Sequence, residues 1–128
     1  AEPVFFEQAR AKDLCTVLLA SSKSTEPRLQ QIAGISTGFI YYVPQTGITG
    51  LTLSIGRSIR ERLGRIRALS ATPVCVGIGV KSREDVRQLF SLADGVIVGT
   101  RIVEFIEAHR DDPHLAKQTA ALIKGLLP

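Results

Sequence analysis

Two glycine-containing turns follow consecutive apolar segments and could hold a phosphate or another oxyanion. The first contains Gly77 and Gly79, and the second is Gly99-Thr100. Glycine lets backbone N–H groups approach an oxyanion closely, and a helix that begins at Thr100 or Arg101 would add the positive end of its dipole. The alternative is that these glycines only permit tight turns, and their spacing leaves both interpretations open.

The segment 44–53 is a glycine- and threonine-rich loop that contains Gly47, Thr49 and Gly50. Connections from a strand to a helix usually take about 2–6 residues, and longer loops on the active face of a fold often act as lids. A plain solvent-exposed connection is the alternative. We treat this segment as a candidate mobile loop.

The sequence offers no evident general acid or base for the same face. Its twelve acidic residues lie away from the carboxyl ends of the expected strands, and none occurs between Glu26 and Glu61. Asp94 precedes its strand, and His109 and His114 lie in carboxyl-terminal helical segments. We therefore expect a place for a phosphate, no catalytic residue in this chain, and no metal site.

Hydrophobic patterning predicts alternating helices and strands. Apolar runs predict four strands that are buried on both faces, as is typical of a parallel sheet, at 14–20, 39–43, 74–78 and 96–98. Helical spacing predicts helices at 2–12, 25–33, 54–69, 82–90 and 102–109, and a last one from 112. In 54–69 the apolar side is formed by Ile55, Ile59, Leu63 and Ile66, and Ser82 with Asp85 three residues later predicts a capping box. The fold class is α/β, either an open doubly wound sheet or part of a (β/α)8 barrel. Four strands are half of such a barrel, which needs about 250 residues.

Composition indicates one globular domain over residues 1–128, with 45% apolar residues and a net charge of +4. That charge suits an anionic small molecule and is too weak to indicate nucleic acid, and the arginines of 54–69 are interpreted as a solvated helix face.

No apolar run is long enough for a membrane span. Cys15 and Cys75 lie in apolar runs, so we predict buried, reduced thiols and a cytoplasmic or plastid-stroma location.

Four segments in this order resemble the tryptophan synthase alpha chain family. The most diagnostic is Gly38-Phe39-Ile40-Tyr41-Tyr42-Val43 followed by Gly47-Ile48-Thr49-Gly50, which is similar to the family's sixth strand and mobile loop. The others, similar to the helix after strand five and to strands seven and eight with their glycine turns, lie at 25–33, 73–80 and 93–103. The likeness covers the carboxyl-terminal half of the family's (β/α)8 TIM barrel. Together with the absence of Met, this partial coverage favours a processed chain or part of a longer protein.

The resemblance implies a carbon–carbon lyase that cleaves indole-3-glycerol phosphate to indole and glyceraldehyde 3-phosphate in tryptophan biosynthesis. This family uses no cofactor in the alpha chain and passes indole to a beta chain. Its catalytic carboxylates lie on the second strand and the loop after it, outside this chain, so we expect the segment alone to be inactive. The implied substrate-binding residues are Tyr41, Thr49, Gly50, Gly79, Gly99 and Thr100. Gln45 stands where many members have arginine, and Ile78 replaces a phenylalanine. The resemblance places Ile78 near either the indole or the barrel core.

Two other functions remain open: a catalytically inactive phosphate-binding half-barrel, and an alpha-like activator of a beta chain. In each case, four strands alone would leave two sheet edges and an apolar face uncovered. We therefore predict that the chain does not stay monomeric. Its companion would be an amino-terminal half-barrel or a second copy of the chain.

Overall fold

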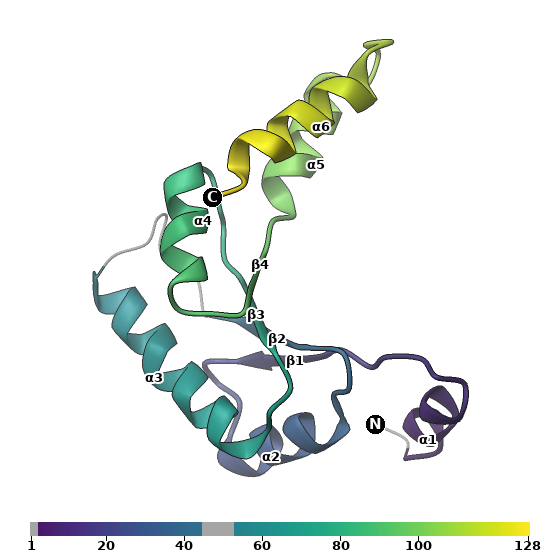
Figure 1. The fold of residues 1–128 in the computed structure, drawn as a ribbon, viewed down its shortest axis with the longest axis vertical. Helices are drawn as coiled ribbons and strands as arrows, with labels where there is room; N and C mark the ends of the chain where they lie inside the picture. Colours follow the sequence, from purple (N-terminus) through teal and green to yellow (C-terminus); the bar gives the residue numbers. More distant parts are fainter. Residues whose placement is uncertain (1–2, 45–52) are drawn as a thin grey trace.

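The computed structural model describes residues 3–44 and 53–128, and it alternates helices with strands (Figure 1). The strands are β1 (Leu18–Ser21), β2 (Ile40–Val43), β3 (Val74–Gly77) and β4 (Gly95–Ile97). The helices are α1 (Pro3–Ala11), α2 (Glu26–Ile35), α3 (Leu53–Leu69), α4 (Arg83–Phe90), α5 (Thr100–Ala108) and α6 (Leu115–Leu126). The predicted order of elements is therefore confirmed.

The four strands form one parallel sheet in the order β1-β2-β3-β4. Each strand pairs with its neighbour in sequence, and α2, α3 and α4 lie on the same side of the sheet (Figure 1). A doubly wound sheet would reverse its strand order and carry helices on both faces. Sequential order with helices on one side is the arrangement of a (β/α)8 barrel, here with half of its strands.

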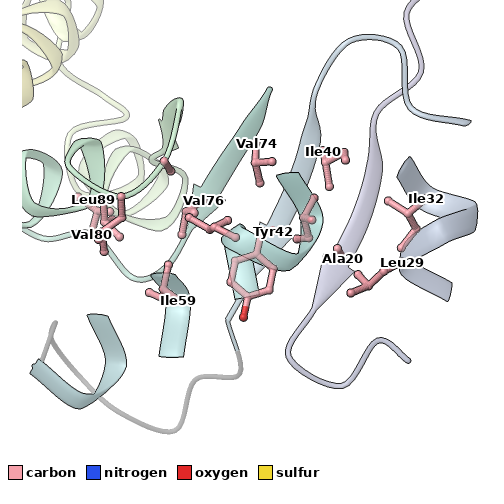
Figure 2. Packing of buried hydrophobic residues seen from close by; sticks show 14 of the residues in the cluster. Ala20, Leu29, Ile32, Ile40, Tyr42, Ile59, Val74, Val76, Val80 and Leu89 are labelled. Carbon is pink, nitrogen blue, oxygen red and sulfur yellow. The ribbon is translucent and has the colours of Figure 1, made fainter. Parts of the chain in front are cut away.

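The hydrophobic core lies between the sheet and α2, α3 and α4. Figure 2 shows Ile40, Tyr42, Val74 and Val76 of the strands turned toward the helices. The helices contribute side chains at most 1% exposed, which are Leu29, Ile32, Ile59, Leu63, Ile66 and Leu89. Burial raises the pKa of the Tyr42 phenol, partly offset by the charge of Arg62, so this residue stays neutral within the core.

The opposite face of the sheet is open, so the prediction of strands buried on both faces is wrong. Leu19, Tyr41, Cys75 and Gly95 form one row across this concave face because they are register partners. Leu19 is 60% exposed. The periodicity of single strands could not reveal this, because the inner face of a barrel is covered only when the other strands are present.

The first strand begins later than predicted, at Leu18 rather than at residue 14. The Thr16 N–H donates to Oγ1 of Thr37 at 2.9 Å, and the Thr16 hydroxyl donates to the Ile35 carbonyl at 2.7 Å. These bonds tie the chain to the turn before β2 instead of to the sheet. Cys15 is consequently exposed, which corrects the prediction that it is buried, and Cys75 is half-buried.

Some arginines of α3 bond to neighbouring segments, and others are exposed to solvent. Arg62 donates to the backbone carbonyls of Ser21, the last residue of β1, and of Ser24 in the turn after it. Arg65 pairs with Glu26 at 3.1 Å, and this exposed pair contributes little to stability. The interpretation as a solvated basic face therefore holds for the outer positions but not for Arg62.

Asp94 connects the start of β4 to the start of β3 through hydrogen bonds. One carboxylate oxygen accepts from the Val74 N–H at 2.8 Å, the other pairs with Arg67 at 3.1 Å, and the Asp94 N–H donates to the Val74 carbonyl at 2.9 Å. We expect Asp94→Ala to lower the free energy of unfolding by about 1–3 kcal/mol, because a charged hydrogen bond to a backbone amide is lost. Arg67→Ala removes only the exposed ion pair and should cost less than about 1 kcal/mol. Urea unfolding of both variants checks this, and equal losses would contradict it.

The remaining helices project from the two ends of the sheet. In Figure 1, α1 extends beyond the β1 side, and α5 and α6 pack against each other beyond the β4 side. Across residues 3–44 and 53–128, no helix has both the length and the apolar character needed to cross a membrane.

Candidate functional site

A cavity of about 160 Å³ opens at the carboxyl ends of β3 and β4, and we call it the β3–β4 cavity. Its lining consists of Tyr41, Gly77, Ile78, Gly79, Val80, Ile97, Gly99 and Thr100. Ligands of parallel α/β folds bind at this end of the strands. The cavity therefore lies where a small ligand is expected.

The glycines at 79 and 99 are not required by the fold around them. A Cβ atom added at Gly79 or Gly99 would meet nothing within 4 Å, and neither residue has the positive φ that favours glycine. Because a side chain would fit at both positions and neither backbone conformation requires glycine, we reject the interpretation that these glycines only permit tight turns. They leave bare backbone along the wall of the cavity, which a ligand could approach closely.

Gly77 is glycine for a different reason, because the Tyr41 side chain lies across it. A Cβ atom at Gly77 would fall within 2.8 Å of Oη, Cε2 and Cζ of Tyr41. The absent side chain thus makes room for the phenol ring. Tyr41 comes from the middle of β2 and reaches the cavity at the end of β3 through this space.

The amino terminus of α5 is left open by its own sequence. Its N-cap is Gly99, which provides no side-chain hydrogen bond, and its first turn contains no acidic residue. Among the described residues, nothing accepts a hydrogen bond from the N–H of Thr100 or Arg101. These free donors and the helix dipole favour an anion at the edge of the cavity that Gly99 and Thr100 line.

The neighbouring helix α4 is closed by its own side chains instead. Ser82 accepts from the Asp85 N–H at 3.1 Å, and the Asp85 carboxylate accepts from the N–H groups of Ser82 and Lys81 at 2.9 and 3.0 Å. The predicted capping box is therefore confirmed. Burial disfavours the charged carboxylate, but these hydrogen bonds outweigh it and lower the pKa of Asp85. Of the two helix termini, α5 is the one left free for a ligand.

The cavity combines backbone donors with neutral side chains. Thr100 is its hydroxyl residue and Tyr41 its phenol, and no carboxylate occurs among the described residues that line it. The thiol of Cys75, next to Tyr41 in the register, has its pKa raised by burial and by the charge of Asp94, so it is protonated at neutral pH. This set of groups can bind an anion but lacks a carboxylate for proton transfer.

Four of the residues predicted from the sequence meet in this cavity: Tyr41, Gly79, Gly99 and Thr100. The other two, Thr49 and Gly50, lie outside the described residues, as does Gln45. Ile78, which was expected near either the ligand or the core, lines the cavity and also packs against the core.

Val80 and Ile97 line the cavity without having been predicted as site residues, and Gly77 was named only as part of a glycine turn that could hold an oxyanion. Ile97 could have been found from the alternation of a strand, because it lies two residues before Gly99. The role of Gly77 depends on the neighbouring strand, and no pattern within its own segment indicates it.

Comparison with known proteins identifies the same family. A family model described as "Tryptophan synthase alpha chain" matches residues 1–126. The chain is 37% identical over 116 residues to the tryptophan synthase alpha chain of Opitutus terrae, covering 91% of this chain and 44% of that protein. It is 36% identical over 96 residues to the alpha chain of Methanocaldococcus jannaschii, covering 75% of this chain and 34% of that protein.

Solved structures with a similar fold belong to the same family. The fold is similar to that of a mutant tryptophan synthase alpha-subunit from Pyrococcus furiosus, with a TM-score of 0.78 and 30% identity, covering 96% of this chain and 48% of that one. It is also similar to the alpha subunit from Campylobacter jejuni, with a TM-score of 0.73 and 28% identity, covering 81% and 42%. The chain spans about half the length of the relatives that it matches. By sequence and by fold, the chain belongs to the tryptophan synthase alpha chain family.

Proposed function

We propose that this chain is the phosphate-binding half of a tryptophan synthase alpha barrel, a carbon–carbon lyase of tryptophan biosynthesis. In this proposal the β3–β4 cavity holds the phosphate of indole-3-glycerol phosphate, or of its product glyceraldehyde 3-phosphate. The observation that carries the proposal is the free amino terminus of α5 beside bare backbone at Gly79 and Gly99. Family membership supplies the substrate class.

The phosphate would be bound mainly by backbone groups. The N–H groups of Gly79 and Thr100 and the Thr100 hydroxyl would donate to its oxygens, while the α5 dipole favours its negative charge. Tyr41 would form the wall that faces the glycerol and indole. We extend the proposal to Thr49 and Gly50, which the resemblance assigns to a loop that closes over the bound substrate.

Cleavage of the substrate would need groups that this chain does not contribute to the cavity. Breaking a carbon–carbon bond with proton transfer requires a positioned acid or base, and the described lining has no carboxylate. In the resembled family those carboxylates belong to the amino-terminal half of the barrel. We therefore propose that this segment binds substrate but is inactive alone, and that the complete barrel delivers indole to a beta chain.

The activity proposal is tested by incubating the purified chain with indole-3-glycerol phosphate and measuring indole by chromatography. We expect no indole above the buffer control. Indole release at a rate proportional to chain concentration, and retained through repeated purification, would contradict the assignment of catalysis to the absent half.

The binding proposal is tested by titrating the isotope-labelled chain with glycerol 3-phosphate and following amide chemical shifts. We expect the shifts to centre on Gly79, Gly99 and Thr100. Gly79→Ala should weaken binding by about tenfold or more, roughly 1.4 kcal/mol, because the new methyl group enters space where the ligand would lie. Its stability should hardly change, since a Cβ there meets nothing within 4 Å.

Gly34→Ala on α2 is the matched control, because a Cβ there also meets nothing within 4 Å and the residue lies outside the cavity. It should bind glycerol 3-phosphate as the unchanged chain does. Equal affinity of the Gly79→Ala variant, or shifts centred on another part of the chain, would contradict the proposed site.

We also propose a reducing compartment, either the cytoplasm or the plastid stroma. The support is chemical, since Cys15 and Cys75 are both free thiols and Cys15 is exposed. Exposed free thiols persist where thiol reductants are maintained.

A further inference from the structure

A second open cavity, of about 590 Å³, lies on the helix side of the sheet between the turn after β1 and helix α3. We call it the α3 cavity, and its lining consists of Ser22, Tyr42, Ser58, Glu61, Arg62 and Arg65. None of these residues lines the β3–β4 cavity. Volumes of about 300–1,000 Å³ are typical of small-molecule sites, so the α3 cavity is large enough for a small organic ligand.

Arg62 brings a half-buried positive charge to this cavity. Its Nη2 donates to the carbonyls of Ser21 and Ser24, whereas its Nε is buried and has no hydrogen-bond partner among the described residues. Within residues 3–44 and 53–128, no carboxylate forms an ion pair with this guanidinium. A charge that is partly removed from water without a counter-charge is unfavourable, and a bound anion would offset that cost.

Most other groups that line the cavity are hydrogen-bond donors. They are the guanidinium of Arg65, the hydroxyls of Ser22 and Ser58, and the phenol of Tyr42. Figure 2 shows the Tyr42 ring extending from β2 into the helix layer, with its hydroxyl at the far end. The charge of Arg62 opposes the rise that burial causes in the pKa of Tyr42, so the guanidinium lies close to the phenol. Arginine and hydroxyl groups together suit the oxygens of an anion.

The charges around the cavity leave it positive. Ser58, Arg62 and Arg65 follow one another at helical spacing along one side of α3. Arg65 pairs with Glu26 of α2 at 3.1 Å, but its side chain is 64% exposed and keeps further N–H groups accessible. Glu61 is the one carboxylate among the described lining residues, against two arginines.

We propose that the α3 cavity binds the phosphate group of a small molecule, at a site separate from the β3–β4 cavity. Arg62 contributes its buried Nε, Arg65 its exposed guanidinium, and the serine hydroxyls complete the set of donors. A phosphate group suits these donors better than a carboxylate, because it offers three acceptor oxygens to groups that approach from different elements. The walls of the cavity are the turn after β1, strand β2 and helix α3 of this chain, so the site does not depend on the strands that complete the barrel.

The test is a titration of the isotope-labelled chain with inorganic phosphate at constant ionic strength. It follows the Nε–H resonance of Arg62 and the amides of Ser22 and Ser58. We expect these signals to shift with saturation, both in the unchanged chain and in the Gly79→Ala chain. The α3 cavity is thereby distinguished from the β3–β4 cavity, since Gly79→Ala should weaken only the phosphate-dependent shifts of Gly99 and Thr100.

Two substitutions in the lining should change phosphate binding in opposite directions. Arg65→Gln should weaken it by about fivefold or more, because a charged donor is lost. Its exposure allows this change without disturbing the fold. Glu61→Gln should strengthen binding by about twofold or more, because a nearby negative charge is removed. Arg60→Gln, at an exposed position of α3 outside the cavity, is the matched control and should bind phosphate as the unchanged chain does.

Arg62→Lys tests the buried Nε, because lysine keeps the charge but lacks the planar fork. We expect this variant to lose most of the binding while circular dichroism shows an unchanged helix content. Acetate, titrated in the same way, should shift these signals only at much higher concentration than phosphate does.

Four outcomes would overturn the proposal. Shifts confined to Gly99 and Thr100 would leave the β3–β4 cavity as the phosphate site and remove the α3 cavity. Shifts at Arg62 that grow linearly without saturation would indicate weak, unspecific attraction. Equal weakening by Arg60→Gln and Arg65→Gln would indicate the general charge of the helix rather than a site. Equal affinity for acetate would contradict the assignment to phosphate.

Discussion

Gly77→Ala should both destabilise the chain and weaken its binding of glycerol 3-phosphate. The added methyl group would fall within 2.8 Å of three atoms of the Tyr41 ring, so the ring must leave its place or β3 must shift. Overpacking of this kind typically costs about 1–3 kcal/mol. Urea unfolding measures the loss of stability, and amide titration with glycerol 3-phosphate measures the loss of binding.

A second substitution separates the Tyr41 contact from a general intolerance of alanine in β3. Tyr41→Ala in the Gly77→Ala chain removes the clashing ring and should recover most of the lost stability. Gly79→Ala, two residues along, should leave stability unchanged because its Cβ meets nothing within 4 Å. A Gly77→Ala chain as stable as the original, or a double variant less stable than either single one, would contradict this explanation.

Leu63→Ala should cause the largest loss of stability among conservative substitutions in α3. Leu63 is completely buried between this helix and the sheet. Truncating such a leucine removes favourable burial and leaves a cavity, which together cost about 2–5 kcal/mol. Urea unfolding followed by circular dichroism checks this, with every variant at the same chain concentration because association would add to stability.

The adjacent residue provides the control for Leu63→Ala. Gly64 lies on the exposed side of the same helix, and a Cβ there meets nothing within 4 Å. Gly64→Ala should raise the free energy of unfolding by about 0.5–1 kcal/mol, because alanine restricts the unfolded chain and favours helix. Destabilisation by Gly64→Ala, or a Leu63→Ala loss below about 1 kcal/mol, would contradict the burial described for this helix.

Much of the architecture could be predicted because its signals are local. Apolar runs in 39–43 and 74–78 predicted β2 and β3 to within a residue, and Ser82 with Asp85 indicated the start of α4. Helical spacing located the buried side of α3, at Ile59, Leu63 and Ile66. Each of these signals depends on side chains a few residues apart, whose periodicity reflects which side is buried.

The candidate site could be predicted in part. Gly79, Gly99 and Thr100 were found because turns after parallel strands meet at one end of the sheet. Tyr41 was named only through family resemblance, because nothing in its own segment shows that its ring crosses Gly77. The roles of Thr49 and Gly50 stay predictions, since these residues lie outside the described structure.

The sequence by itself determined the α/β class, the order of the elements and the turns with bare backbone, because these follow from local propensity and periodicity. Only the tertiary structure decided that the helices cover one face and that Cys15 and Leu19 are exposed. These properties depend on contacts between segments that are distant in sequence. A hydrophobic pattern records that a side chain should be buried, but the element that buries it is found only in the assembled fold.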